Sequence, residues 1–214
     1  MRRAIAAALL ALSAPAAAQD VLPLSGVETA LFGCLNADLD IEVLVERLES
    51  HGWVDTPPER LGERAFRALA AKLAVNYIAM QEPNASWPGI WEAQMDMARA
   101  HGRRAAVPGR RFLTHPGNRS FVDVSSTAYD GGGTIRCEIV ADPDSLGPGI
   151  RGSVLPETGS GDPPVFIGPA ADLSEGDETA TVSAIVLDGP AISEATGAPF
   201  PFAAIVSVFR RAPS

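Results

Sequence analysis

The chain has 214 residues, with 26 acidic and 17 basic side chains, a formal net charge of −9 at pH 7 and 46% hydrophobic residues. An acidic surface repels nucleic acid and anionic membranes at long range, which excludes both as partners. The length and the apolar content suit one domain with its own hydrophobic core.

The first 18 residues have the order of a bacterial secretory signal peptide. Arg2 and Arg3 give a positive start, residues 4–12 are apolar, and residues 16–18 are three alanines. Small residues at that place are typical of a signal cleavage site, which we put before Gln19. The apolar run is too short for a spanning helix, which needs roughly 20 residues. An uncleaved anchor is the alternative.

We therefore expect residues 1–18 to be a cleaved signal peptide and residues 19–214 to form a single α+β domain. Loss of Arg2 and Arg3 would take the net charge from −9 to −11. No other segment is long and apolar enough to span a bilayer. The predicted location is the periplasm or the extracellular space.

The chain has two cysteines, Cys34 and Cys137. An even number of cysteines in an exported protein favours a disulfide bond, because oxidising compartments let such bonds persist. A Cys34–Cys137 bond would close a loop of about 100 residues and limit the entropy of the unfolded chain. The alternative is two buried free thiols that act as small apolar residues.

The first half of the chain predicts about four helices. The first follows Ser25 as N-cap, with Val27, Leu31 and Cys34 on one apolar stripe. The second follows Asp38 or Asp40 and ends at the pair 51–52, His-Gly, where glycine suits a left-handed C-terminal cap.

The third helix is predicted to start at Thr56, with Pro57 and Pro58 in its first turn, where the missing N–H groups cost little. The fourth is predicted from Pro88 to His101. Both predictions rest on apolar residues that recur at the spacing of one helix face.

The second half changes to an alternating pattern, with frequent Gly and Pro. About five strands are predicted, at residues 110–115, 119–127, 134–142, 179–188 and 202–211. The last two are apolar at nearly every position, which favours central strands that are covered on both faces. Helices followed by strands predict an α+β fold, with about four N-terminal helices packed on a C-terminal, mostly antiparallel sheet.

Residues 155–159 read LPETG and resemble the signal that sortases cut before they attach a protein to the cell wall. The segment that follows is acidic and contains the last two predicted strands, so cleavage would remove both from the core. The surrounding composition, rich in Gly and Pro, is typical of a loop. We interpret the motif as part of a surface loop.

The chain carries no convincing catalytic or metal-binding motif. Its three histidines, at positions 51, 101 and 115, lack the close spacing of zinc ligands, and two of them precede a helix-ending glycine. No nucleophile motif is present, and a disulfide would leave no free thiolate. We therefore expect no metal and no cofactor.

The leading hypothesis is an exported, non-catalytic protein that binds a small ligand or a protein partner in the cell envelope. Trp87 and Trp91 lie four residues apart and could share one helix face. If exposed, they would form a binding anchor. If buried, they would be core packing, as in a purely structural envelope protein.

The alternative is a secreted hydrolase that uses carboxylates. Asp123 and Glu138 lie on neighbouring predicted strands and are the best available pair. General acid–base catalysis would require both side chains on one face of a cleft.

Overall fold

The computed structural model describes residues 26–35, 40–78, 84–102, 107–117, 120–130, 132–141, 179–187 and 203–211, with shorter stretches at 145, 165–167, 171–172, 192–194 and 197. The predicted signal peptide and the LPETG motif lie outside these residues. In the ranges that are described, no helix is long and apolar enough to cross a membrane.

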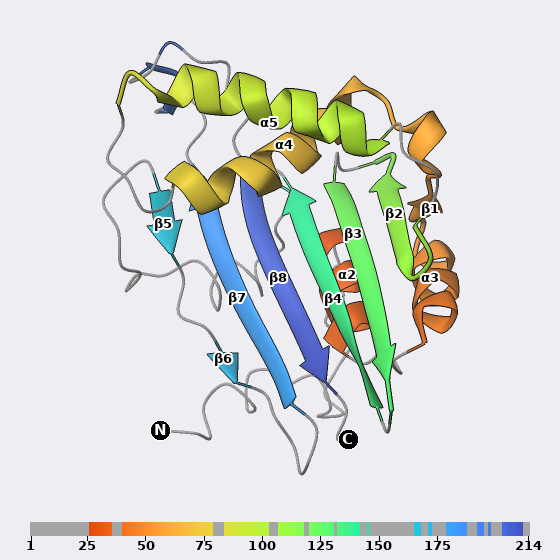
Figure 1. Cartoon of the computed structure of the whole chain (residues 1–214). Coiled ribbons are helices and arrows are strands. Elements are labelled where there is room, and N and C mark those ends of the chain that lie inside the picture. The colour runs from red at the N-terminus through yellow and green to blue at the C-terminus, as the bar shows by residue number, and fades with distance from the viewer. Residues whose placement is uncertain are drawn as a thin grey trace, which may run out of the picture.

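An antiparallel sheet forms the middle of the molecule (Figure 1). Its strands follow the order β1-β2-β3-β4-β8-β7-β5, and β6 also pairs with β7. The strands are β1 Val54–Asp55, β2 Arg110–His115, β3 Ser120–Tyr129, β4 Gly132–Ala141, β5 Val165–Ile167, β6 Ala171–Asp172, β7 Thr179–Leu187 and β8 Ala203–Arg211. The five longer strands are the predicted ones, and the α+β class is confirmed. The other three have two or three residues, too few for a pattern in the sequence to reveal them.

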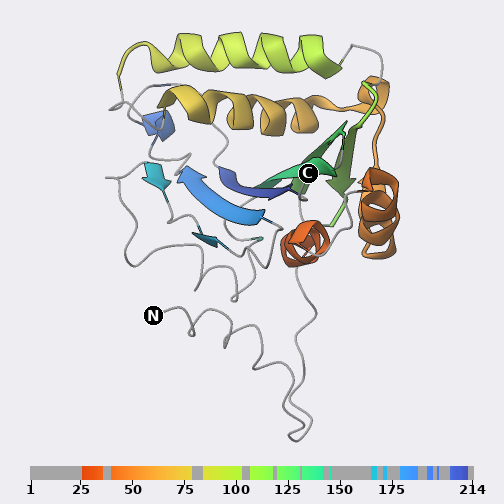
Figure 2. The same cartoon turned by 60° about the horizontal axis from the view of Figure 1, so that its bottom comes forward.

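Helices lie on both faces of the sheet. They are α2 Gly26–Leu35, α3 Ile41–Ser50, α4 Glu63–Ile78 and α5 Trp87–Gly102, with the short 3-10 helix η2 at Pro58–Arg60. Figure 2 shows α5 stacked on α4 above one face and α2 below the other. We call the side of α4 the front face. In Figure 1, α4 crosses only one end of the front face, and no other helix of the described residues covers the rest of β3, β4, β8 and β7 there.

The two faces carry separate hydrophobic clusters because successive side chains of a strand point to opposite sides. Val122, Cys137 and Val208 pack with α2 and α3 behind the sheet. Phe121, Val140 and Ile205 pack with α4 and α5 in front. The β3–β4, β4–β8 and β8–β7 registers run without interruption, so this alternation holds along the strands.

Three helices begin and end within a residue or two of the predicted positions. Asp40 caps α3 by accepting a hydrogen bond from the backbone N–H of Glu42, and Gly52 follows the helix with a φ of 86°. The predicted start of the third helix at Thr56 is wrong. Pro57 has an extended backbone, as a residue before proline prefers, so Pro58–Arg60 forms only one 3-10 turn before α4 starts at Glu63.

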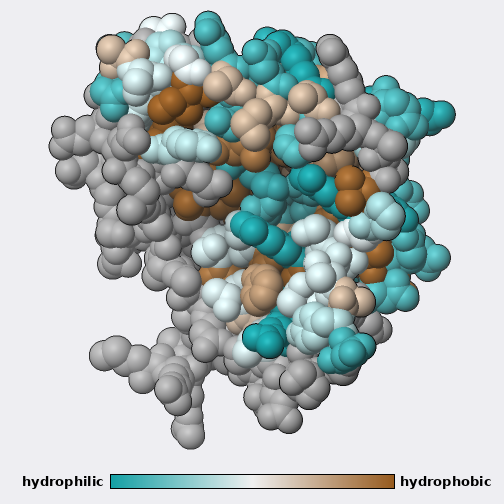
Figure 3. All heavy atoms as spheres, in the orientation of Figure 1, coloured by the Kyte–Doolittle hydropathy of each residue, from teal (hydrophilic) through white to brown (hydrophobic). Residues whose placement is uncertain are grey.

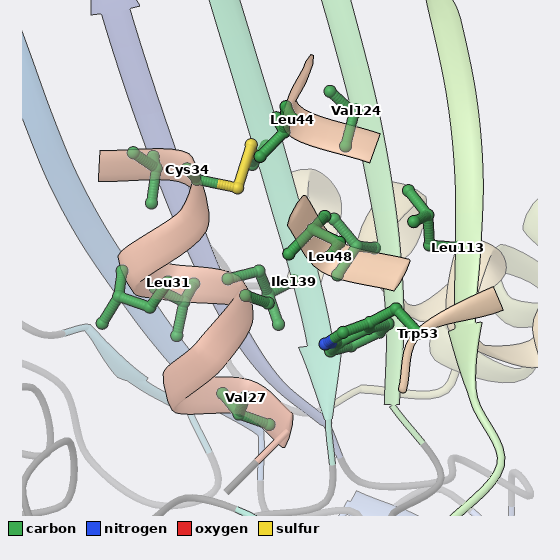
Figure 4. Close-up of a cluster of buried hydrophobic side chains, with 14 of the residues drawn as sticks. Val27, Leu31, Cys34, Leu44, Leu48, Trp53, Leu113, Val124 and Ile139 are labelled. Atoms are coloured by element: carbon green, nitrogen blue, oxygen red, sulfur yellow. A yellow bond between two sulfur atoms is a disulfide. The ribbon is translucent and has the colours of Figure 1, made fainter. Parts of the chain in front are cut away.

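The predicted disulfide is confirmed. Cys34 of α2 bonds to Cys137 of β4, with the two Cα atoms 6.3 Å apart. Both cysteines are fully buried in the rear cluster. Figure 4 shows the bond joining α2 to the sheet beside Leu44, with Leu31 and Val27 further along the same helix. The bond holds α2 against β4.

Candidate functional site

A row of charged side chains crosses the front face where α4 stops covering it. Asp123 of β3 and Glu138 of β4 are direct partners in the β3–β4 register. They come two residues after Phe121 and two before Val140, which belong to the front cluster, so both carboxylates point to the front. Both residues are buried.

Lys72 of α4 reaches this row from above. Its Nζ lies 2.5 Å from Oδ2 of Asp123 and also forms an ion pair with Glu138. Arg110 of β2 donates from Nε and Nη2 to the two oxygens of Asp123, at 2.8 and 2.6 Å. Arg136 of β4 donates to Oε1 of Glu138 at 2.8 Å. We call these five residues the ionic row.

The ionic row keeps Asp123 ionised. Burial alone would raise the pKa of this carboxyl, since a low dielectric disfavours the charged form. The hydrogen bonds from Arg110 and the positive charges of Lys72 and Arg110 outweigh burial and hold the pKa below its ordinary value of 3.8. The same hydrogen bonds raise the pKa of Arg110.

The sequence pairs Asp123 with Glu138, and the structure places them opposite each other on one face. It also shows what sequence reasoning missed, namely the three cations that hold them. One of these cations could have been suspected from the sequence. Lys72 is the only lysine of the chain, and it lies in an otherwise apolar stretch at residues 68–75. Asp123 is a poor general acid, because its lowered pKa keeps it ionised near neutral pH and its hydrogen bonds from Arg110 and Lys72 hold it in place.

Stability should fall in acid as Asp123 takes up a proton. A carboxyl with a lowered folded pKa adds stability above its unfolded pKa and loses it as the pH falls through the folded pKa. We expect Asp123→Asn to be less stable than wild type at pH 7, with the difference shrinking toward pH 2. Urea unfolding across that range tests this, with Asp96→Asn on an exposed helix face as the control. A constant difference between wild type and Asp123→Asn would contradict the prediction.

The two candidate tryptophans lie in the front cluster rather than on an open surface. Trp87 is fully buried and Trp91 is 5% exposed. Their burial fits the core-packing alternative, while a binding role stays a prediction. Trp91 also lines a hollow of about 490 Å³ between α4 and α5. Arg67 and Arg99 at this hollow already pair with carboxylates of its lining, for example Arg99 with Glu63 at 3.0 Å.

Beyond the ionic row, the front face of the sheet is polar and accessible to solvent. In the register, Ser125, Arg136, Phe209 and Thr181 form one cross-strand row, and Thr127, Thr134 and Arg211 belong to the next. We call these seven residues the open face; Arg136 belongs both to it and to the ionic row, which meet at this residue. Phe209 is 39% exposed, and the other six are half-buried or exposed. Figure 3 shows mainly white and teal side chains across this part of the molecule.

The open face corrects one prediction. The apolar pattern of the last two strands predicts cover on both faces, but β8 carries half-buried Ser207 and exposed Phe209 on its front. The strand is central, between β4 and β7, as expected. Its front is covered only as far as α4 extends, so Ile205 is buried while Phe209 is not.

Together, these features describe an α+β protein whose antiparallel sheet lies between two helical layers. A disulfide joins α2 to β4, and part of the front face is polar and accessible to solvent. Comparisons with protein-family models, curated proteins and solved structures found no match.

Proposed function

We propose that this chain is an exported, non-catalytic protein that binds a small ligand or a protein partner in the periplasm or outside the cell. The observation that carries the proposal is the open face, a solvent-accessible surface on which Phe209 lies beside Arg136 and Arg211. An exposed aromatic ring beside arginines is typical of binding surfaces.

The disulfide supports export, because such bonds persist in oxidising compartments. The ionic row supports a binding role over the hydrolase alternative. Lys72, Arg110 and Arg136 occupy both carboxylates, and the lowered pKa of Asp123 removes it as a general acid near neutral pH. The row instead provides a fixed edge to the open face.

Mass spectrometry of the protein recovered from its source cells tests the proposal. Under denaturing conditions, we expect the mass of residues 19–214 less two hydrogens, which would report both the cleavage and the disulfide. Under native conditions, we expect additional mass that dissociates on denaturation.

A mass that retains residues 1–18 would contradict export with cleavage. A native mass without any bound species, together with turnover of an ester or glycoside substrate that Glu138→Gln abolishes, would contradict the non-catalytic proposal and favour the hydrolase. Asp96→Asn is the matched control for that turnover assay, since it removes an exposed carboxylate elsewhere.

A further inference from the structure

We infer, resting on the proposed function, that the open face binds a short saccharide that carries carboxylate groups. The arginines of the face supply charge, its hydroxyls supply matched hydrogen-bonding groups, and Phe209 supplies an apolar surface.

The ionic row and the open face together carry more cations than carboxylates, whereas the chain as a whole is acidic. The described front-face side chains of the ionic row and the open face include four cations, Lys72, Arg110, Arg136 and Arg211, against the two carboxylates Asp123 and Glu138. Asp172 of β6 is the register partner of Thr181, and Asp130 lies further along, in the turn between β3 and β4. The chain carries a net charge of −9. Since salt screens charges beyond about 8 Å, a ligand on the open face interacts more strongly with these nearby cations than with distant acidic residues of the chain.

Two of these cations have donors to spare. Arg136 has a 56% exposed side chain and donates from Nη2 to Oε1 of Glu138. Arg211 is exposed, and its Nε donates to the hydroxyl of Tyr129 at 3.2 Å while its guanidinium lies over that ring. A guanidinium carries five N–H donors, so these contacts orient both groups and leave donors for a carboxylate.

The spacing of the face suits a chain of sugar rings. Phe209 is the direct partner of Arg136, and Arg211 is the next residue on the same face of β8. Arg136 and Arg211 are therefore diagonal neighbours across the two strands, and such residues lie roughly 7–8 Å apart. A pyranose ring has an apolar C–H face that can stack on Phe209, while its hydroxyls can exchange hydrogen bonds with Ser125, Thr134 and Thr181.

Other classes of anion fit this face less well. An extended acidic peptide binds a sheet best by pairing with an edge strand, whereas β8 is already paired with β4 and β7. A nucleic acid is a long polyanion that would extend beyond this small group of cations onto an acidic surface. A short saccharide needs only the open face, whose edge toward α4 is the ionic row that Lys72 joins.

Calorimetric titration of the mature, disulfide-closed protein with trigalacturonate tests the inference. We expect measurable binding at low salt that weakens as salt rises, and no binding of the neutral maltotriose. Arg211→Gln and Phe209→Ala should each weaken the affinity by about tenfold, the effect of losing one charged hydrogen bond or one buried ring contact. Arg60→Gln, in exposed η2, removes the same charge outside the face and should leave affinity unchanged.

Absence of trigalacturonate binding would overturn the inference, and so would binding that ignores both Arg211→Gln and Phe209→Ala. Equal binding of hexaglutamate with the same dependence on Arg211 would also overturn it, in favour of acidic peptides. A ligand retained in native mass spectrometry together with no trigalacturonate binding would leave the proposed function standing and overturn only the saccharide class. Circular dichroism melts of each variant identify any loss that comes from unfolding.

Discussion

Lys72→Met is expected to lower the free energy of unfolding by about 3 kcal/mol, since removing one partner of a buried ion pair leaves an uncompensated buried charge. Lys72 is the cation that both Asp123 and Glu138 share, and its side chain is 13% exposed. It also joins α4 to the sheet, so its loss weakens the contact between two layers. Urea unfolding at pH 7, followed by tryptophan fluorescence, measures the change.

Two further variants separate charge from packing. Arg64→Met removes a cation from an exposed position of the same helix and should change stability by less than about 0.5 kcal/mol. Adding Asp123→Asn and Glu138→Gln to Lys72→Met should recover part of the loss, because neutral amides do not require a cation. A Lys72→Met protein whose free energy of unfolding lies within about 0.5 kcal/mol of wild type would show that Lys72 does not stabilise the ionic row.

Removal of the disulfide should have an effect of similar or greater size. The Cys34–Cys137 bond closes a loop with a sequence separation of 103 residues, for which chain entropy gives about 4–5 kcal/mol. Because both cysteines are fully buried between α2 and the sheet, we expect the double variant Cys34→Ala, Cys137→Ala to unfold at much lower urea concentration than wild type.

Reduction of the wild-type protein provides the matched comparison, since it opens the loop without deleting either side chain. Reduced wild type should lie close to the double variant, with the remaining difference due to the two sulfur atoms. Mass spectrometry must first verify that the bond has been reduced. Reduced and oxidised proteins with the same urea midpoint would show that the bond adds no stability.

Much of the fold follows from local pattern. Helix periodicity, caps such as Asp40 and the alternation of Thr134–Ala141 specify elements whose core-facing residues repeat at fixed intervals. The disulfide was predictable for a related reason, because Cys34 and Cys137 each fall on the apolar side of their element. The short strand β1 was not predictable, since two residues are too few to show an alternating pattern. It forms because β2 lies beside it and pairs with it.

The candidate site was predictable only in part. Sequence alone placed Asp123 and Glu138 on neighbouring strands, and the β3–β4 register of the structure places them opposite each other. It did not bring in Lys72, which is 51 residues away from Asp123 along the chain. That contact depends on where α4 lies across the sheet, and helix placement is set by packing against Phe121, Val140 and Ile205 rather than by local pattern.

The sequence by itself determined the longer helices and strands, because each depends on periodicity within a short segment, and it indicated the cysteine pair. The tertiary structure decided which polar side chains meet and which stay exposed. Asp123 and Phe209 both lie on the front of strands with apolar patterns, yet one is 3% exposed and the other 39%. The reason is the length of sheet that α4 covers: residues beneath the helix lose contact with water, and residues beyond its edge remain accessible.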